Sequence, residues 1–300
     1  HQCAGRIQHT YPPSPMPLAF DAAQLPKAYD LRQARIELDR LAAAWTPPED
    51  SSLPNPTQSQ TLLTAIFGNS PYLSQLVVNE AAHFFAVLAD GPDSVFNKLL
   101  NDLAGLGQAD TDEATLMRGL RQAKRRAHMT IAIADIVKAW PLEQVTSALS
   151  DFADAAVQSA VSYLLRVAHA AEELDLPHPD EPAKDSGLVI LGLGKLGARE
   201  LNYSSDIDLI VLFDLEVVRY RGRKTARECF VKLARNLVRL LSDSTQDGYV
   251  LRVDLRLRPD PASTPLAIST IAAETYYEGM GQNWERAAMI KARPIAARSQ

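Results

Sequence analysis

The sequence predicts an α+β fold, in which a helical N-terminal domain leads into a mixed-sheet domain with C-terminal helices. Apolar residues recur at helical spacing through the first half of the chain. Beyond Gly187 the pattern changes to short apolar runs bounded by glycines and to strict alternation, which are typical of strands. The 300 residues, 46% of them hydrophobic, allow two domains. We expect the helical domain over residues 1–180 and the sheet-containing domain over 181–300.

Two proline-rich breaks, at residues 46–56 and 176–187, divide the helical part of the chain. Proline interrupts a helix because it lacks a backbone N–H and its ring clashes with the preceding turn. Outside these breaks, the apolar spacing predicts six helices. Their expected ranges are 25–45, 58–67, 71–89, 93–105, 112–139 and 142–174.

The second domain begins with a continuous apolar run, "GLVILGLG" (187–194), which predicts a strand that ends in glycines. A second strand is predicted at "DIDLIVLF" (206–213), followed by an amphipathic helix over 225–241. The segment 249–259 alternates apolar and polar residues and predicts another strand. A last helix is expected at "WERAAMIKAR" (284–293).

The composition of the chain bears on its binding partners and on its cellular location. The net charge of −5 gives no reason to expect a nucleic acid or an anionic membrane surface. No apolar stretch approaches the ~20 residues of a membrane span, and the N-terminal residues lack the apolar core of a signal peptide. Two cysteines, Cys3 and Cys229, cannot stabilise a chain of this size by disulfides, which favours a reducing compartment. We therefore expect a soluble cytoplasmic protein with no nucleic-acid or membrane partner.

Asp206 and Asp208 interrupt the start of an otherwise apolar strand. A buried carboxylate is costly unless it is paired or binds a metal ion. Residues i and i+2 of a strand point to one face, ~6.5–7 Å apart, so the two aspartates project side by side while Ile207 and Leu209 turn to the core. Such a pair can bind Mg²⁺ or Mn²⁺. Asp254, on the polar face of another predicted strand, could supply a third carboxylate.

A glycine turn, "GLGKLG" (192–197), lies shortly before this aspartate pair. Gly192, Gly194 and Gly197 would let backbone N–H groups approach a triphosphate closely. Lys195 adds a positive charge. Together the turn and the carboxylates indicate a site for phosphoryl or nucleotidyl transfer.

Other interpretations fit parts of these motifs. "GLGKLG" also matches the GxGxxG of dinucleotide-binding proteins, with Asp214 about 20 residues downstream. Only "ARELNYSS" separates the turn from Asp206, however, whereas a βαβ unit needs ~30 residues. A glycosyltransferase with an Asp-x-Asp motif would give the glycine turn no role, and the aspartates alone are also compatible with solvated strand-start residues or with a cap. No GxxxxGK[ST] sequence is present, which excludes a P-loop NTPase.

Three segments together resemble the glutamine-synthetase adenylyltransferase/deadenylylase family: "LVILGLGKLGARELNYSSDIDLIVLFD", "TQDGYVLRVDLRLRPDP" and "WERAAMIKARPIA". More broadly they resemble the DNA-polymerase-β-like nucleotidyltransferases, in which a glycine turn precedes Asp-x-Asp and a distal Asp. The resemblance covers about residues 187–297. Family members carry two such domains in a longer chain, and "ELNYSSDIDLI" is similar to the N-terminal half, which removes AMP. The resemblance thus implies a fragment that lacks the adenylylating half and part of the C-terminal helical structure.

The resemblance also implies roles for individual residues. The implied catalytic metal ligands, for Mg²⁺ or Mn²⁺, are Asp206, Asp208 and Asp254. The residues implied to contact the nucleotide (ADP or ATP) and phosphate are Gly192, Gly194, Lys195, Ser205, Arg256 and Arg258. For the two arginines, structural ion pairing is the alternative.

The implied reaction is phosphorolysis, in which phosphate attacks a tyrosyl-AMP on glutamine synthetase to give ADP and free tyrosine. Adenylyl transfer from ATP to the same tyrosine stays open as an alternative, as does a non-catalytic fragment that docks glutamine synthetase or the PII signalling protein. By family analogy, uridylylated PII and 2-oxoglutarate are expected activators, and glutamine is expected to oppose them.

Overall fold

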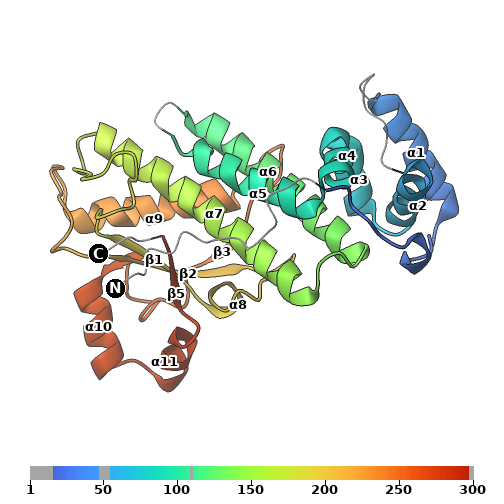
Figure 1. Cartoon of the computed structure of the whole chain (residues 1–300). Coiled ribbons are helices and arrows are strands. Elements are labelled where there is room, and N and C mark those ends of the chain that lie inside the picture. The colour runs from blue at the N-terminus through green and yellow to red at the C-terminus, as the bar shows by residue number, and fades with distance from the viewer. Residues whose placement is uncertain (1–15, 47–54, 109–110, 297–300) are drawn as a thin grey trace. The chain divides into compact units, whose positions relative to one another are not determined.

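The computed structural model describes residues 16–46, 55–108 and 111–296 (Figure 1). Within these ranges it contains eleven α-helices, a 3₁₀ helix at Ala22–Gln24 and five strands. The predicted α+β class is therefore confirmed. Cys3 and most of the first proline-rich break lie outside the described ranges.

The chain divides into two compact units, residues 1–101 with 125–145 and residues 102–124 with 146–300. The domain boundary expected near residue 180 stays a prediction. Three helices contribute residues to both units: α5 (Pro92–Leu106), α6 (Glu113–Ile136) and α7 (Leu142–Ala170). No helix of the described ranges is both long enough and apolar enough to cross a membrane.

The first unit is helical. Its other helices are α1 (Leu31–Ala44), α2 (Pro56–Phe67), α3 (Pro71–Asn79) and α4 (Ala81–Asp90). Asp30, Asn55 and Ser70 cap the first three of these, each accepting a hydrogen bond from a backbone N–H of the first turn. The core of the unit is formed by side chains that are almost completely buried, among them Leu62, Phe67, Val77, Phe84 and Val87.

The single helix predicted over 71–89 is wrong, because the structure breaks it at Glu80. This residue leaves the helical conformation, with φ −125° and ψ 41°. Its buried carboxylate accepts hydrogen bonds from Arg125 at 3.2 Å and from Arg126 at 2.9 Å. At the break, the Glu80 carboxylate thus binds two guanidiniums from a distant part of the sequence. The hydrophobic periodicity of residues 71–89 gives no sign of these contacts.

The second unit is built on a five-stranded mixed sheet. Its strands are β1 (Leu188–Gly192), β2 (Ile207–Phe213), β3 (Val253–Asp254), β4 (Ala267–Ser269) and β5 (Arg293–Ala296). The strand order is β3-β2-β1-β5, and β4 also pairs with β2. β1 runs antiparallel to β2 and β5, whereas β3 and β4 run parallel to β2.

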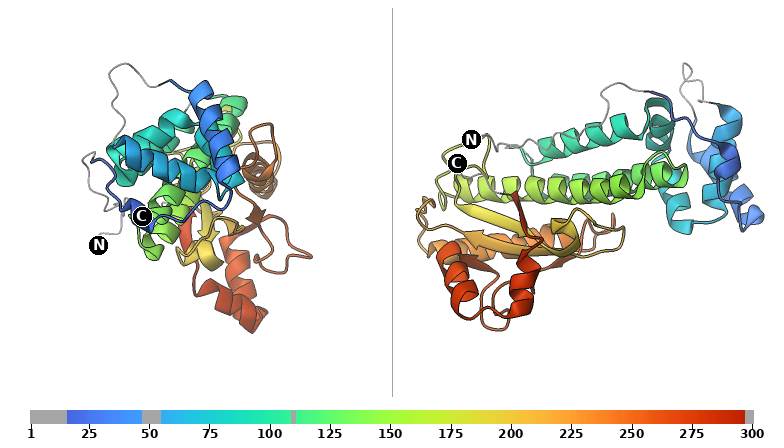
Figure 2. Two further views of the ribbon diagram at one scale, coloured as in Figure 1. Left: turned by 90° about the vertical axis from the view of Figure 1, so that its right-hand side faces the viewer. Right: turned by 60° about the horizontal axis from the view of Figure 1, so that its bottom comes forward.

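Helices flank this sheet. The remaining helices of the unit are α8 (Gly194–Gly197), α9 (Ala226–Ser242), α10 (Thr270–Gly279) and α11 (Asn283–Met289). Figures 1 and 2 show α7 running along one side of the sheet, with α10 and α11 on the other side. α9 begins with a capping box, in which Thr225 and Glu228 each bind the backbone N–H of the other. Its apolar stripe is buried, and the Phe230 ring stacks on Phe213 of β2 at 5.0 Å between centroids.

The strand predicted over 249–259 is wrong in length, since only Val253 and Asp254 form one. Val250 and Leu251 are both buried, which breaks the alternation that a strand requires. Their N–H groups donate to the Leu241 carbonyl at the end of α9, at 2.9 and 3.0 Å, instead of to a neighbouring strand. The helix predicted over 284–293 ends at Met289, and β4, α10 and β5 were not predicted.

Candidate active site

Asp208 and Asp254 lie opposite each other on neighbouring strands. β2 and β3 are parallel, and their register pairs Ile207 with Val253 and Asp208 with Asp254. Ile207 is completely buried, as the predicted alternation requires, so the aspartates on either side of it point away from the core. Asp206, the first of them, lies one residue before β2. The fold therefore brings together three carboxylates that are separated by up to 48 residues in the sequence.

Burial and the neighbouring carboxylates both disfavour the ionised form of Asp208. Its pKa is raised, first by burial and then by the negative charges of Asp254 and Asp206. The pKa of Asp254 is lowered, because the Arg256 guanidinium donates hydrogen bonds to it. Of the residues that the structure describes, none forms an ion pair with Asp208. Asp208 is thus the carboxylate of the three that lacks a direct cationic partner.

Gly194 packs directly against Asp208. Its φ is +54°, and a Cβ atom there would lie 2.5 Å from Asp208 Oδ2. The backbone N–H of the preceding Leu193 donates to the Asp208 carbonyl at 2.9 Å. Only glycine satisfies both the left-handed conformation and this close approach. The glycine turn predicted from the sequence therefore lies beside the predicted metal ligand.

The other turn residues take different positions. Gly192 ends β1, where it pairs with Leu209 of β2. Lys195 lies on α8, and its Nζ donates to Ser205 Oγ at 3.4 Å. The Ser205 hydroxyl in turn donates to Asn202 Oδ1 at 2.6 Å. A side-chain hydrogen bond therefore joins Lys195 to Ser205, the residue that precedes Asp206.

Arg256 and Arg252 each bind one carboxylate of the site. Arg256 Nε lies 3.0 and 2.9 Å from the two oxygens of Asp254. Arg252 pairs with Asp206 and also donates to the Ser204 carbonyl. Arg252 was not among the residues predicted for the site. The signal that could have selected it is its spacing of two residues from Asp254.

Arg258 does not reach the carboxylates. Its guanidinium donates to the carbonyls of Leu255 and Pro261, both at 2.8 Å, and of Thr264 at 3.3 Å. These hydrogen bonds link parts of the loop that joins β3 to β4. Of the two predicted arginines, the structure therefore brings Arg256 to the aspartates and turns Arg258 into the loop.

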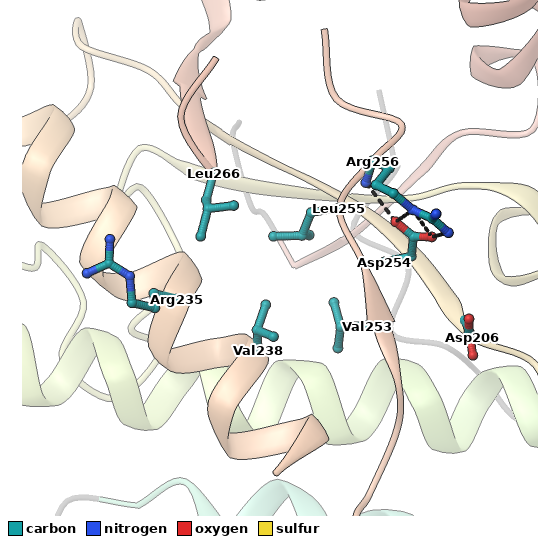
Figure 3. Close-up of a pocket in the computed structure, with 8 residues that line it drawn as sticks. All are labelled: Asp206, Arg235, Val238, Val253, Asp254, Leu255, Arg256 and Leu266. Carbon is teal, nitrogen blue, oxygen red and sulfur yellow. Dashed lines mark hydrogen bonds and ion pairs between the residues drawn. The ribbon is translucent and has the colours of Figure 1, made fainter. Parts of the chain in front are cut away.

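A pocket of about 490 Å³ adjoins the carboxylates. It is lined by Asp206, Arg235, Val238, Val253, Asp254, Leu255, Arg256 and Leu266. Figure 3 shows the apolar side chains between Arg235, on α9, and the Asp254–Arg256 ion pair. The pocket therefore combines apolar walls with charged groups at both ends, a combination suited to a ligand with a ring system and a charged part.

The three carboxylates fit a hard cation by their chemistry. As the side chains stand, no group of three His, Cys, Asp or Glu residues within the described part of the chain is close enough to hold a metal ion. In this arrangement Asp206 is paired with Arg252, and Asp254 is paired with Arg256. Asp208 has no such partner among the described residues, and Asp254 and Asp206 repel its charged form.

The structure contradicts the dinucleotide-binding interpretation of the glycine turn. A βαβ unit requires parallel strands joined by a full crossover helix. Here β1 and β2 are antiparallel, and α8 between them has four residues. The glycines instead allow close packing, as at Gly197, where a Cβ atom would lie 2.0 Å from the Lys291 carbonyl oxygen.

Comparison with known proteins gives a consistent family. The family model for glutamate-ammonia ligase adenylyltransferase matches residues 60–300. Among curated proteins, the bifunctional glutamine synthetase adenylyltransferase/adenylyl-removing enzyme of Brucella suis is 48% identical over 78% of this chain and 24% of its own length. Those of Xanthobacter autotrophicus (44%, over 93% of this chain and 28% of the relative) and Mesorhizobium japonicum (46%, over 89% and 28%) are similar. The chain spans about a quarter of the length of these relatives, and it belongs to the glutamate-ammonia ligase adenylyltransferase family.

Proposed function

We propose that this chain carries a nucleotidyltransferase site that removes AMP from an adenylylated tyrosine of glutamine synthetase by phosphorolysis. The observation that carries the proposal is the parallel pairing of β2 with β3, which sets Asp208 opposite Asp254 and beside Gly194. The relatives are bifunctional by name. The similarity of "ELNYSSDIDLI" to the AMP-removing half selects the direction of the reaction.

Asp206, Asp208 and Asp254 would hold Mg²⁺ or Mn²⁺. When bound, the ion would neutralise charge on the transferring phosphoryl group and orient the nucleophile. Gly194, in a left-handed conformation that glycine adopts without strain, lets the turn lie directly against Asp208. Lys195 extends a positive charge from the same turn. Phosphoryl transfer depends mainly on such positioning and charge stabilisation.

The remaining residues would act around this centre. Gly192 keeps the end of β1 compact beside the turn. Arg256 could exchange Asp254 for a phosphate oxygen, because its side chain is largely exposed. Ser205 would hold Lys195 in place. Arg258 would shape the loop beside the pocket and would not contact phosphate.

In the proposed reaction, an oxygen of inorganic phosphate attacks the α-phosphorus of tyrosyl-AMP. A phosphorus–oxygen bond forms to the incoming phosphate, and the bond to the phenolic oxygen of tyrosine breaks. The electron pair leaves on the phenolate, which takes a proton from solvent. A phenolate, with a pKa of ~10 for its conjugate acid, leaves more readily than an alkoxide. The products are ADP and free tyrosine.

The proposal extends to cellular context. Glutamine synthetase is the proposed substrate protein, because the names of the relatives specify it. The uridylylated PII protein is the proposed regulator, and the cytoplasm is the proposed location. These follow from family resemblance, with the substrate protein the best supported of them.

The product test is direct. The chain is incubated with adenylylated glutamine synthetase, Mg²⁺ and phosphate, and the released nucleotide is identified by chromatography. We expect ADP, released only when phosphate is present, and no fresh adenylylation of unmodified glutamine synthetase from ATP. Release of AMP without phosphate would make water the nucleophile. Efficient transfer from ATP would assign the chain to the adenylylating activity instead.

A further inference from the structure

Helix α7 presents a polar face to the segments around the glycine turn. Ser147, Ser150, Asp151 and Asp154 follow the i, i+3, i+4, i+7 spacing of one helical face. The last three are almost completely buried. Ser150 Oγ accepts a hydrogen bond from the backbone N–H of Leu201 at 3.3 Å. A buried polar stripe of this kind needs partners, and several of them come from segments next to α8.

Arg199 is the first of these partners. It follows α8 by two residues and takes a left-handed φ of +61°. Its guanidinium pairs with Asp151 and donates to Ser147 Oγ at 2.8 Å. A non-glycine residue in this conformation persists only where its surroundings impose it. The bonds to α7 supply that restraint at the end of the glycine turn.

Arg293 is the second partner, and it touches the turn itself. Its guanidinium contacts both Asp154 oxygens, at 3.0 Å from Nη2 and 2.6 Å from Nη1. The same Nη2 donates to the carbonyl of Leu196, inside α8, at 3.1 Å. Arg293 also pairs in register with Gly192, through β5 and β1. One guanidinium thus joins α7 and α8.

Stability alone does not account for this pair. Desolvation of two charges commonly cancels their attraction, and burial raises the pKa of Asp154 to about 6 in spite of the arginine. Arg293 Nε also lacks a hydrogen-bond acceptor in the described part of the chain. Apolar side chains of similar volume would fill such a site at no loss of stability. The fork geometry of arginine, in contrast, fixes the carbonyl of Leu196 relative to α7.

We propose that Asp154 and Arg293 are positioning residues, which hold the glycine turn at the distance from Asp208 that phosphate binding requires. The inference rests on the proposed function for its catalytic consequence. Asp151 and Arg199 act in the same way at the other end of the turn. Neither pair contacts the proposed reacting atoms, so their effect passes through the position of Gly194.

The test separates positioning from stability. The double variant Asp154→Leu/Arg293→Met removes the pair without leaving a lone buried charge, while each single variant leaves one. We expect the single variants to lower the melting temperature and the double variant to regain most of it. The KM for phosphate in ADP release should nevertheless stay raised by about tenfold or more in the double variant, because small displacements cost large factors in rate. Recovery of both stability and KM would overturn the proposal.

Two further variants complete the experiment. Arg293→Lys keeps the charge but loses the fork, so it should fold and still raise the KM for phosphate. The matched control is Glu113→Gln/Arg239→Gln, which removes an ion pair of 2.6 Å within the same unit but away from the turn. It should leave the KM unchanged. A normal KM in Arg293→Lys would contradict a positioning role.

Amide hydrogen exchange supplies a readout that does not need activity. In the Asp154→Leu/Arg293→Met variant, peptides covering residues 193–201 should exchange about tenfold faster than in the control pair variant. If the wild-type chain released no ADP but this difference appeared, the proposed function would fail while the positioning of the turn stood. Unchanged exchange in these peptides would refute the positioning itself.

Discussion

Asp208 is the carboxylate of the site whose charged form the fold disfavours. It lies between two other carboxylates and beside a glycine that leaves no space for a side chain. Burial and the neighbouring negative charges raise its pKa. A raised pKa means that the folded state disfavours ionisation, so the stability linked to this group is greatest at low pH and is lost as the pH rises through the folded pKa. The fold therefore disfavours the charged form of Asp208.

Replacing Asp208 by Asn should therefore separate activity from stability. We expect ADP release to be abolished, because the central metal ligand is lost. The melting temperature at pH 7 should stay the same or rise, since a neutral amide does not repel Asp206 and Asp254. Activity assays across a Mg²⁺ titration, with thermal unfolding of both proteins, check this. Wild-type turnover of the variant at any Mg²⁺ concentration would rule out the assignment.

Arg256 and Arg258 are expected to differ although they are two residues apart. Arg256→Ala removes a largely exposed side chain beside the carboxylates, so it should raise the phosphate concentration needed for ADP release with little change in stability. Arg258→Ala removes hydrogen bonds to three carbonyls of its loop, so it should lower the free energy of unfolding by ~1–3 kcal/mol. Phosphate titrations and denaturant unfolding of both variants distinguish the roles. The reverse assignment would hold if Arg258→Ala alone changed the phosphate requirement.

At the scale of elements, the sequence predicts those strands and helices whose own residues carry a clear hydrophobic pattern. β1, β2 and α9 follow from apolar runs and a helical stripe, and the structure has them within a residue or two of the expected bounds. The segment 249–259 alternates well but binds the end of α9 through its backbone, so only two residues pair as a strand. β4 and β5 are too short, at three and four residues, to carry a readable period.

The polar contacts between different helices and strands could not be predicted from the sequence. Asp154 and Arg293 are 139 residues apart, and Arg252 pairs with Asp206 across 46 residues. Neither pair follows from spacing along one helix or strand. The meeting of Asp208 with Asp254 could be anticipated, because both motifs pointed to one polar face. Which arginine would pair with each carboxylate could not be anticipated, because Arg252, Arg256 and Arg258 share one face of the alternating segment.

The contact between α7 and β5 should be visible in the pH dependence of stability. The pKa of Asp154 rises from 3.8 to about 6, mainly by burial, with Arg293, Arg199 and Asp151 as the charged groups that face it. The raised value means that its contribution to stability is complete below pH 3.8 and is lost as the pH rises through 6. The stability difference between wild type and Asp154→Asn should therefore fall by on the order of 2–3 kcal/mol between pH 4 and 7. Denaturant unfolding at constant ionic strength measures it, and a constant difference would contradict the burial of an ionisable Asp154.

At the scale of the whole molecule, the described part of the chain contains a unit built on a five-stranded mixed sheet, and the chain spans about a quarter of the length of its bifunctional relatives. Three carboxylates, a glycine turn and a pocket with apolar walls and charged ends lie together in that unit. The carboxylates are common to AMP addition and AMP removal, because both displace a group at the α-phosphorus. The direction of the reaction is therefore the claim that most needs a measurement of its own.

Isotope transfer tests that claim most directly. The chain is incubated with adenylylated glutamine synthetase, Mg²⁺ and ³²P-labelled inorganic phosphate, with Asp208→Asn as the inactive control. We expect ADP that carries the label in its β-phosphate, in a quantity equal to the tyrosine freed on glutamine synthetase, and no label in the control. Unlabelled AMP as the released nucleotide, or labelled ADP formed equally well by Asp208→Asn, would contradict it.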